Sequence, residues 1–548
     1  MSAIQRHVSA RQELTQRWYA EGWYGEQTLF DVLSTGSTAR PNTRIIFETE
    51  SGRRELTLMT ALADAERLAA ALHQRGVRAT DVVAVQLPNW PEALVTYAAI
   101  ARLGATILPI VHIYGPAETG FIVAQANAKA LILPDVWGSI DYLERLESMV
   151  RPAGLEHVIV VGDRAPHGAL RFGDLMRANA ARVDDSSVGP DERCVLLYTS
   201  GTTAEPKGVQ HSHNSFLTEL RTSPTPPQGE ADTVNFQPFP AGHIAGLTAL
   251  LGPFVHGFTT ILMDRWNPRG AAAAIEEFGV TAMSGTPFHI ASLLDELGDE
   301  RASRVGLRHI VTGGAGVPPT LVERADSCGW SVARCYGSSE QPTVTASPSD
   351  APISERAYSD GSALPGNDVR IADDGEVLII GPDQFLGYSN PTYDNDAFTE
   401  DGWFRTGDIG TLDSGRLTIT DRKKDVIIRG GENISSSEVE AVLARHDAIA
   451  EAAVVAVPDD RYGERVGAFV ILRPGASIAL HDVQELFRTS GMARQKTPER
   501  LFVVDEFPRT AAGKVKKHEL RSSLSRASGG RDSRRPATNR PPGATSAC

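Results

Sequence analysis

Cysteine is scarce in this chain and follows no pattern. Four cysteines occur in 548 residues, Cys194, Cys328, Cys335 and Cys548, and none of them forms a Cys-x-x-Cys pair or lies beside a cluster of histidines. Disulfide frameworks and cysteine-based zinc sites are usually marked by closely spaced cysteines, so neither is expected here. The thiols are expected to be free in a reducing compartment.

Long apolar runs and an excess of positive charge are also missing. No stretch of about 18 apolar residues occurs, and the N-terminus lacks the apolar core of a signal peptide. The formal net charge is -14. An acidic surface disfavours nonspecific nucleic-acid binding, because the phosphate backbone would repel it. These properties predict a cytoplasmic protein with no nucleic-acid partner and no integral membrane segment; a homo-oligomer is compatible with them.

The first part of the chain has the pattern of an α/β protein. A length of 548 residues exceeds one hydrophobic core, so two or more domains are expected. Apolar side chains at helical spacing predict helices over residues 58–77 and 91–103. Short apolar runs predict strands at residues 82–87, 105–110, 130–134 and 158–161. Strands that alternate with helices predict stacked α/β layers with a largely parallel sheet.

The pattern changes in the last third of the chain. Residues 369–420 contain short strands bounded by Gly and Asp, which predict a small β-subdomain of hairpins. A compact α+β unit follows, and from Arg526 onwards no bulky apolar residue remains, so we expect a disordered tail. The predicted division is therefore an N-terminal domain over residues 1–421, a C-terminal domain over 422–525 and a tail over 526–548.

One loop in the N-terminal domain has the composition of a phosphate cradle. The stretch Tyr198-Thr-Ser-Gly-Thr-Thr-Ala-Glu-Pro-Lys-Gly208 follows the apolar run 194–197, which predicts a buried strand. Glycines let backbone N–H groups approach an anion, hydroxyls donate further hydrogen bonds, and the lysine adds charge. The Walker pattern is absent. An ordinary Ser/Thr-rich turn is the alternative for this loop alone.

Four later motifs are each weak alone. Arg334-Cys-Tyr-Gly-Ser-Ser-Glu340 suits a Tyr that stacks on a flat base and a Glu that binds a hard cation near phosphates, or else a turn with a solvated carboxylate. The Gly313–Gly316 turn exposes backbone that a flat ring can approach. Asp408 follows a tight turn and either binds a ribose diol or caps its own turn. Pro508-Arg-Thr-Ala-Ala-Gly-Lys514 presents one lysine on a loop.

Together, in this order and spacing, the motifs resemble the adenylate-forming superfamily of acyl-CoA synthetases, peptide-synthetase adenylation domains and luciferases. The resemblance runs from about Thr28 to Leu524. It implies a large N-terminal domain and a smaller, mobile C-terminal domain joined by a hinge at Lys424. It also implies three small molecules as ligands: ATP, Mg²⁺ and coenzyme A.

The resemblance further implies a role for each matching position. The phosphate loop would comprise Thr199, Ser200, Gly201, Thr202, Thr203 and Lys207. The base, α-phosphate and ribose would contact Gly314, Ala315, Tyr336, Gly337, Ser339, Asp408 and Arg422. Glu340 would hold the Mg²⁺, and Lys514 would be the lysine of the adenylation step. The catalytic set is then Lys514, Glu340, Thr199 and Lys207, and the loop at Gly430 and Gly431 would help to form the pantetheine tunnel.

This chain departs from the family in small ways. Ser339 replaces the usual Thr before the metal-binding Glu and keeps its hydroxyl. Lys424 replaces an Asp at the hinge, which is a variant the family also uses. Thr57-Leu-Met-Thr-Ala is a divergent form of an N-terminal family motif that lies away from the chemistry.

The acid substrate is predicted from the segment Phe239-Pro-Ala-Gly-His-Ile-Ala-Gly-Leu247, which matches the acyl-pocket segment of the family. Its candidate contacts are His243, Ile244, Gly246, Leu247 and Gly313. His243 is either a contact residue or a packed histidine. No Asp stands where amino-acid-activating relatives need one to pair with an amino group, so an apolar fatty, alicyclic or aromatic acid is favoured.

The resemblance therefore predicts an acyl-CoA ligase that forms an acyl-adenylate and passes the acyl group to CoA. The stretches Arg429-Gly-Gly-Glu-Asn-Ile and Gln495-Lys-Thr-Pro-Glu-Arg look most like bacterial medium-chain and cyclohexanecarboxylate-type ligases. The alternatives are an acyl-AMP ligase or stand-alone adenylation enzyme that loads a carrier protein in trans, and a non-catalytic adenylate-binding scaffold. Dependence on free CoA separates the first two.

Overall fold

The computed structural model describes residues 3–178, 181, 183, 188–199, 206–224, 233–429, 432–459, 461–490, 492–510 and 513–528. The chain has two compact units. The larger is Met1–Lys423 with Ala511–Lys514, and the smaller is Lys424–Thr510 with Val515–Cys548. The division falls after Lys423, two residues beyond the predicted boundary.

Two sheets form the large unit. Among the described residues, thirteen strands build the first sheet. In spatial order these are β19 (Asp368–Ile371), β20 (Glu376–Ile380), β22 (Phe404–Asp413), β23 (Arg416–Arg422), β18 (Ser362–Ala363), β17 (Thr345–Ala346), β16 (Ser331–Tyr336), β15 (His309–Thr312), β14 (Ala282–Gly285), β12 (Val234–Gln237), β13 (Thr259–Met263), β1 (Arg44–Thr49) and β2 (Gly52–Thr57). The run from β16 to β1 is parallel, and the strands on either side of it pair antiparallel.

The second sheet has eight strands within the described part of the chain. They are β21 (Gly387–Tyr388), β11 (Lys207–Ser212), β10 (Arg193–Thr199), β4 (Thr106–Pro109), β3 (Val82–Val85), β5 (Ala130–Pro134), β8 (His157–Val161) and β9 (Leu170–Arg171). All neighbours from β10 to β9 are parallel, whereas β11 and β21 add antiparallel strands at one edge. A separate ribbon pairs β6 (Val136–Trp137) with β7 (Ile140–Asp141).

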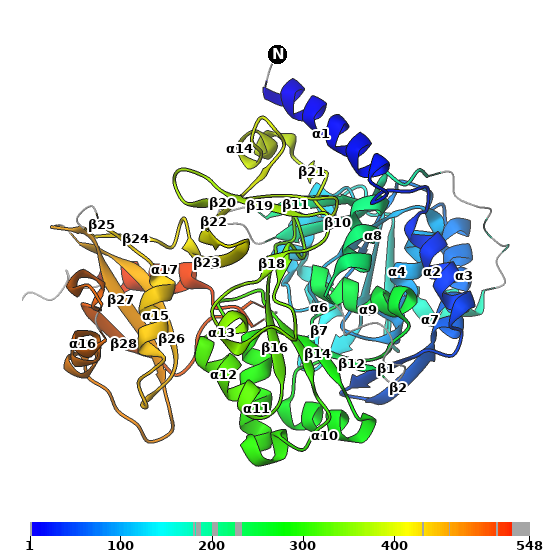
Figure 1. The fold of residues 1–548 in the computed structure, drawn as a ribbon. Helices are drawn as coiled ribbons and strands as arrows, with labels where there is room; N and C mark the ends of the chain where they lie inside the picture. The colour runs from blue at the N-terminus through cyan, green and yellow to red at the C-terminus, as the bar shows by residue number, and fades with distance from the viewer. Residues whose placement is uncertain are drawn as a thin grey trace, which may run out of the picture. The chain divides into compact units, whose positions relative to one another are not determined.

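Helices cover the sheets in layers (Figure 1). One core packs side chains of both sheets against α2 (Leu29–Ala39), α3 (Leu58–Gln74), α4 (Pro91–Leu103), α7 (Phe172–Arg177), α8 (His213–Thr222) and α9 (Ile244–His256). The far face of the first sheet is covered by α10 (Pro268–Phe278), α11 (Pro287–Ala302), α12 (Pro319–Ser327) and α13 (Ile353–Arg356). The far face of the second sheet packs on α5 (Pro116–Gln125) and α6 (Tyr142–Ser148). The result is the predicted stack of α/β layers.

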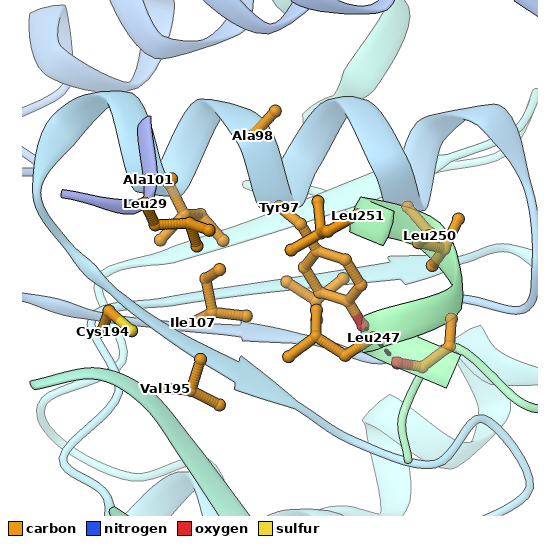
Figure 2. Close-up of a cluster of buried hydrophobic side chains, with 14 of the residues drawn as sticks. Leu29, Tyr97, Ala98, Ala101, Ile107, Cys194, Val195, Leu247, Leu250 and Leu251 are labelled. Atoms are coloured by element: carbon orange, nitrogen blue, oxygen red, sulfur yellow. Dashed lines mark hydrogen bonds between the residues drawn. The ribbon is translucent and has the colours of Figure 1, made fainter. Parts of the chain in front are cut away.

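Strand periodicity explains how one sheet serves two cores. Ile45 and Phe47 of β1 point into the core between the sheets, while Ile46 points to the core on the opposite face. Alternate residues of a strand face opposite sides, and burial of each such side chain contributes about 1.5–3 kcal/mol. Figure 2 shows Tyr97 of α4 beside Leu247 of α9 in the central core. Its hydroxyl donates to the Ala241 carbonyl at 2.9 Å, so this buried polar group is satisfied.

The predicted β-subdomain is an extension of the first sheet. Strands β19, β20, β22 and β23 form the expected hairpins, but β18 and β17 join them to β16 by continuous pairing. Most other predicted elements are confirmed within a few residues. Residues 91–103 form α4 as predicted, and the helix predicted over 58–77 is α3, which ends at Gln74.

The smaller unit is the predicted α+β domain. Its sheet has the order β25 (Glu432–Ile434), β24 (Ile427–Arg429), β27 (Gly463–Leu472), β26 (Ile449–Asp459), and β28 (Arg500–Val503) pairs with β27. Helices α15 (Ser436–Leu443) and α16 (Leu480–Thr489) pack on it. Helix α17 (Lys517–Ser528) extends three residues into the predicted tail, and residues 529–548 lie outside the described chain. None of the described helices is both long and apolar enough to cross a membrane.

Candidate active site

A tight turn after β16 presents the predicted Tyr336–Glu340 motif. Gly337 is required there, because a Cβ at this position would lie 1.9 Å from the Pro342 carbonyl oxygen. The Ser338 Oγ accepts hydrogen bonds from the backbone N–H groups of Glu340 (3.2 Å) and Gln341 (3.3 Å). The turn therefore fixes the direction of the Glu340 side chain before any ligand binds.

A buried histidine supports this turn from behind. Nε2 of His211 on β11 lies 2.7 Å from the Ser339 carbonyl oxygen. A carbonyl oxygen only accepts, so Nε2 carries the proton. Burial lowers the pKa of His211 to about 4, so the ring is neutral at pH 7. His211 was not among the predicted residues, because a buried histidine within a strand has no motif of its own.

Glu340 is joined to Lys207 through an aromatic residue that the sequence did not reveal. The Tyr388 hydroxyl donates to Glu340 Oε1 at 2.8 Å. Nζ of Lys207 lies 5.0 Å from the centre of the Tyr388 ring and 4.7 Å from that of Tyr393, which is distance for cation–π attraction. The predicted cation and the predicted carboxylate are therefore held on opposite parts of one tyrosine side chain.

Lys207 and Thr199 close the mouth of the predicted phosphate loop. They are register partners in the antiparallel pair of β10 and β11. The loop positions Ser200, Gly201, Thr202 and Thr203 lie outside the described residues. The structure does place the two strands that flank this loop, β10 before it and β11 after it.

A second group of predicted residues meets around Asp408. The side chain of Arg422 on β23 lies opposite Asp408 of β22, with Nε 3.1 Å from Oδ1. The hydroxyl of Tyr336 donates to Asp408 Oδ2 at 2.7 Å. Burial, together with the Asp408 charge, raises the pKa of Tyr336 well above its usual range, so the phenol stays protonated. The carboxylate is thus oriented through both of its oxygens, and its contact with a ribose diol stays a prediction.

The glycine turn lies beside the same strand. Gly313 follows β15, which pairs in parallel with β16, and a Cβ on Gly313 would lie 2.6 Å from the Cys335 carbonyl oxygen. Gly314 has φ +75, a conformation that favours glycine. The backbone from Gly313 to Ala315 therefore runs next to the strand that leads to Tyr336.

The predicted acyl-pocket residues divide into packed and less buried ones. Leu247 and Ile244 are buried in the central core, Leu247 next to Tyr97 (Figure 2). Gly246 has no space for a side chain, since a Cβ would lie 1.8 Å from the Pro240 carbonyl oxygen. His243 caps α9, its Nδ1 accepting from Ala245 N at 3.3 Å, and its ring stacks on Phe239. Their contact with an acyl group stays a prediction.

Lys514 is grouped with the large unit, and its positive charge adds to burial in lowering the pKa of His243. Residues Ala511–Lys514 belong to that unit. Burial first, and the positive charge of Lys514 second, lower the pKa of His243 to about 4. A cation near the segment predicted to contact the acid suits a step in which anions meet. Gly430 and Gly431 lie outside the described residues, and Lys424 is the first residue of the smaller unit.

Within the described residues, no group of three or more His, Cys, Asp or Glu side chains is placed to hold a metal ion by itself. Glu340 offers a single carboxylate, of which Oε1 accepts from Tyr388. Mg²⁺ in phosphate sites is usually held by one or two carboxylates together with the substrate phosphates. The donor set therefore fits an ion that arrives with a nucleotide, and not a dedicated protein cage.

Two buried carboxyl groups lie behind the Glu340 turn. The Thr343 hydroxyl donates to Glu219 at 2.8 Å, and Gln341 Nε2 donates to Asp383 at 2.9 Å. Burial, with the neighbouring Asp383 as the second cause, raises the pKa of Glu219 to about 8. Burial likewise raises the pKa of Asp383. Sequence patterns predicted neither, because both acids are buried only by tertiary packing.

Glu219 makes the stability of the fold depend on pH. Its pKa is about 8 in the folded chain and lies near the ordinary glutamate value when unfolded. Between these values the folded state holds the extra proton, so stability falls as pH rises and levels off above pH 8. The slope for one such group is at most about 1.4 kcal/mol per pH unit.

We expect Glu219→Gln to be more stable relative to wild type at pH 9 than at pH 6, since glutamine stays neutral. Unfolding in urea at both pH values measures this difference. Glu300→Gln, on a side chain that is 84% exposed, is the matched control and should change neither value. Equal pH dependence in Glu219→Gln and wild type would contradict the assignment.

Comparisons with known proteins agree with this arrangement. The family profile described as AMP-binding enzyme matches residues 35–389, and that described as AMP-binding enzyme C-terminal domain matches residues 438–514. The chain is 31% identical over 525 residues to the medium-chain fatty-acid–CoA ligase of Escherichia coli (strain K12), covering 92% of both chains. It is 32% identical over 487 residues to the indoleacetate–CoA ligase of Aromatoleum aromaticum, covering 86% of this chain and 94% of the relative.

A solved structure has the same fold. The ATP-bound MatB from Rhodopseudomonas palustris superposes with a TM-score of 0.79 at 27% identity, covering 91% of this chain and 99% of that chain. The fold class predicted from the sequence is therefore confirmed.

Proposed function

Because the chain belongs to the AMP-binding enzyme family, we propose that it is an ATP-dependent acyl-CoA ligase acting on an apolar carboxylic acid. Relatives across most of its length are acid–thiol ligases, and the chain is an enzyme of that class. In the proposed reaction the carboxylate attacks the α-phosphate of ATP, which releases pyrophosphate and gives an acyl-adenylate. The thiolate of CoA then displaces AMP.

The observation that carries the proposal is the convergence of two groups of residues on the turn after β16. Lys207 and Glu340 meet at Tyr388, and Asp408 and Arg422 meet at Tyr336. Since Tyr336 and Glu340 are four residues apart, a nucleotide along this turn has its ribose end near Asp408 and its phosphate end near Lys207. This order matches the order of chemical groups in ATP.

The proposed roles follow from charge. The attacking carboxylate and the α-phosphate repel each other by roughly 4 kcal/mol at ~4 Å and an effective dielectric of ~20. Lys207 and Lys514 offset this repulsion without a protein nucleophile, so the chain contributes positioning and electrostatic stabilisation. A Mg²⁺ ion at Glu340 would supply further charge neutralisation on the phosphates when bound.

The proposed acid is apolar because the segment around His243 has little polar character. Ile244, Ala245 and Gly246 offer no carboxylate to pair with an amino group, and burial keeps His243 neutral at pH 7. A neutral imidazole gives no strong attraction to a second carboxylate on the substrate. A monocarboxylic fatty, alicyclic or aromatic acid suits these surroundings.

A panel of carboxylic acids tests the function. Fatty, alicyclic, aromatic and α-amino acids are incubated separately with ATP and Mg²⁺, with and without CoA, and release of pyrophosphate and of AMP is measured. We expect pyrophosphate release only with apolar acids, and sustained AMP release only when free CoA is present. Faster turnover of an α-amino acid would contradict the acid class. Adenylate that persists with CoA and reacts only with a carrier-protein thiol would favour the carrier-loading alternative.

A further inference from the structure

The N-terminal segment forms hydrogen bonds to the loop at residues 382–385, which leads to the candidate active site. The guanidinium of Arg11 on α1 (Ala3–Ala20) donates from Nη1 to the Phe385 carbonyl at 2.6 Å and from Nη2 to the Gln384 carbonyl at 3.2 Å. Tyr24 donates its hydroxyl to the Pro382 carbonyl at 2.9 Å. Three hydrogen bonds from the N-terminal segment thus hold three carbonyls of residues 382–385.

Arg11 and Tyr24 are held in place by packing against Trp18. The Arg11 guanidinium lies 5.3 Å from the centre of the Trp18 ring, and Trp18 and Tyr24 have ring centres 5.2 Å apart. Trp18 is 2% and Tyr24 6% exposed. A planar guanidinium with two directed bonds to successive carbonyls fixes the orientation of both peptide groups. A lysine at this position would offer a point charge without that fixed geometry.

The same loop holds Glu340 from its other edge. The Phe385 backbone N–H donates to the Glu340 carbonyl at 2.8 Å, and Leu386 N–H donates to the Gln210 carbonyl at 2.7 Å. Two residues further on, Tyr388 donates to the Glu340 carboxylate. In Figure 1, α1 lies beside α14 (Asp394–Ala397), which follows this loop and β21 in the chain.

This connection lies partly outside the residues that the family profile matches. Arg11 and Tyr24 precede residue 35, where the match to the family profile begins. The match therefore assigns no role to α1. Covering a patch of the large unit would need only apolar contacts, whereas the Arg11 guanidinium donates to the carbonyls of Gln384 and Phe385, and the Phe385 N–H donates to the Glu340 carbonyl.

We propose that Arg11 is a positioning residue that holds residues 382–388 so that Phe385 and Tyr388 keep the Glu340 carboxylate ready for a metal–nucleotide complex. The inference rests on the role proposed above for Glu340. Arg11 itself does not touch the nucleotide. Without the Arg11 hydrogen bonds, residues 382–388 are less firmly held. In part of the population Glu340 then loses the Phe385 N–H donor, the Tyr388 hydroxyl donor or both.

Binding of a non-hydrolysable ATP analogue tests this proposal without turnover. Its Kd is measured by calorimetry with Mg²⁺ and with EDTA for wild type and Arg11→Met. We expect Arg11→Met to reduce the Mg²⁺-dependent gain in affinity by about three- to tenfold, within the range that mutations at a distance produce. Kd in EDTA should stay within about twofold of wild type. Arg11→Lys should lose less of the gain than Arg11→Met, and this smaller loss is the result to measure if Arg11→Met does not fold.

Arg17→Met is the matched control on the same helix, because the Arg17 side chain is 54% exposed and forms a surface pair with Glu21. It should leave both Kd values unchanged. A purely structural role of Arg11 would weaken binding equally with and without Mg²⁺, and that result would overturn the proposal.

Combination with Glu340→Gln separates the two assignments. Glu340→Gln alone should remove most of the Mg²⁺-dependent gain, and Arg11→Met added to it should cause no further loss, since both changes act through one carboxylate. An intact gain in Glu340→Gln would overturn the role of Glu340 itself. A lost gain in Glu340→Gln with a wild-type gain in Arg11→Met would overturn only the positioning role of Arg11.

Discussion

Lys514→Ala is expected to abolish acyl-adenylate formation while leaving the second half-reaction nearly intact. The first step brings a carboxylate to a polyphosphate, and Lys514 is a cation close enough to His243 to lower the pKa of that ring. Removing one preorganised charge or donor aimed at developing charge costs about 10²–10³ in rate. In the second step the CoA thiolate attacks the acyl carbon of the adenylate, which is a mixed anhydride, and AMP leaves. No carboxylate has to approach a polyphosphate in this step, so we expect it not to need the same lysine.

The two half-reactions are measured separately. Pyrophosphate release with acid and ATP reports the first, and acyl-CoA formation from synthetic acyl-adenylate and CoA reports the second. Lys516→Ala is the matched control. Lys516 lies two residues after Lys514 in the sequence and forms a surface pair with Glu519 at 2.9 Å. The His243 pKa, followed by NMR, should rise in Lys514→Ala and stay unchanged in Lys516→Ala. Equal damage to both half-reactions would contradict a role confined to adenylation.

Lys424→Pro is expected to give the opposite pattern. Lys424 begins the smaller unit, and the proposed hinge motion at this residue would present a different face of that unit in each step. Proline fixes φ near about −65°, so it restricts the torsion that a hinge needs. Adenylation should stay within a few-fold of wild type, and thiol transfer from supplied adenylate should slow markedly.

The layered α/β architecture could be predicted because its signals are local. Helix α4 begins with Pro91 at its first turn and ends before Gly104, which has φ 66, so both ends are marked in the sequence. The apolar runs of β3, β4, β5 and β8 are buried on both faces, which gives the continuous apolar pattern of parallel strands. Short-range patterns of this kind do not need to know which strands are neighbours.

The predicted site residues were identified because they occur within motifs, but the links between them are long-range. Asp408 and Arg422 become partners through the hairpin of β22 and β23, whose turn at Ser414 and Gly415 is visible in the sequence. Tyr388 reaches Glu340 only because β21 pairs with β11 at the edge of the other sheet. Pairing between distant strands is set by the packing of both sheets, so neither Tyr388 nor His211 could be assigned beforehand.

Asp408→Asn is expected to weaken nucleotide binding by about two orders of magnitude through the ribose. Asp408 is buried and takes a hydroxyl donor from Tyr336 and the guanidinium of Arg422. Asparagine keeps the shape, but its NH₂ group opposes one of these two donors, and the charge that holds Arg422 is lost. Loss of two hydrogen bonds between the diol and a charged carboxylate accounts for about 3 kcal/mol, at 1.4 kcal/mol per tenfold.

A nucleotide without the diol shows whether this loss belongs to the ribose. Kd is measured for an ATP analogue and for its 2′,3′-dideoxy form with wild type, Asp408→Asn and Asp401→Asn. Asp401 pairs with Arg370 at the surface and is 57% exposed, so its variant should bind both nucleotides as wild type does. If Asp408 receives the diol, the dideoxy form binds wild type and Asp408→Asn with nearly the same weak affinity, because each lacks one partner of the same contact. A further large loss for the dideoxy form with Asp408→Asn would mean that Asp408 acts by holding Tyr336 and Arg422, and the ribose assignment would then be wrong.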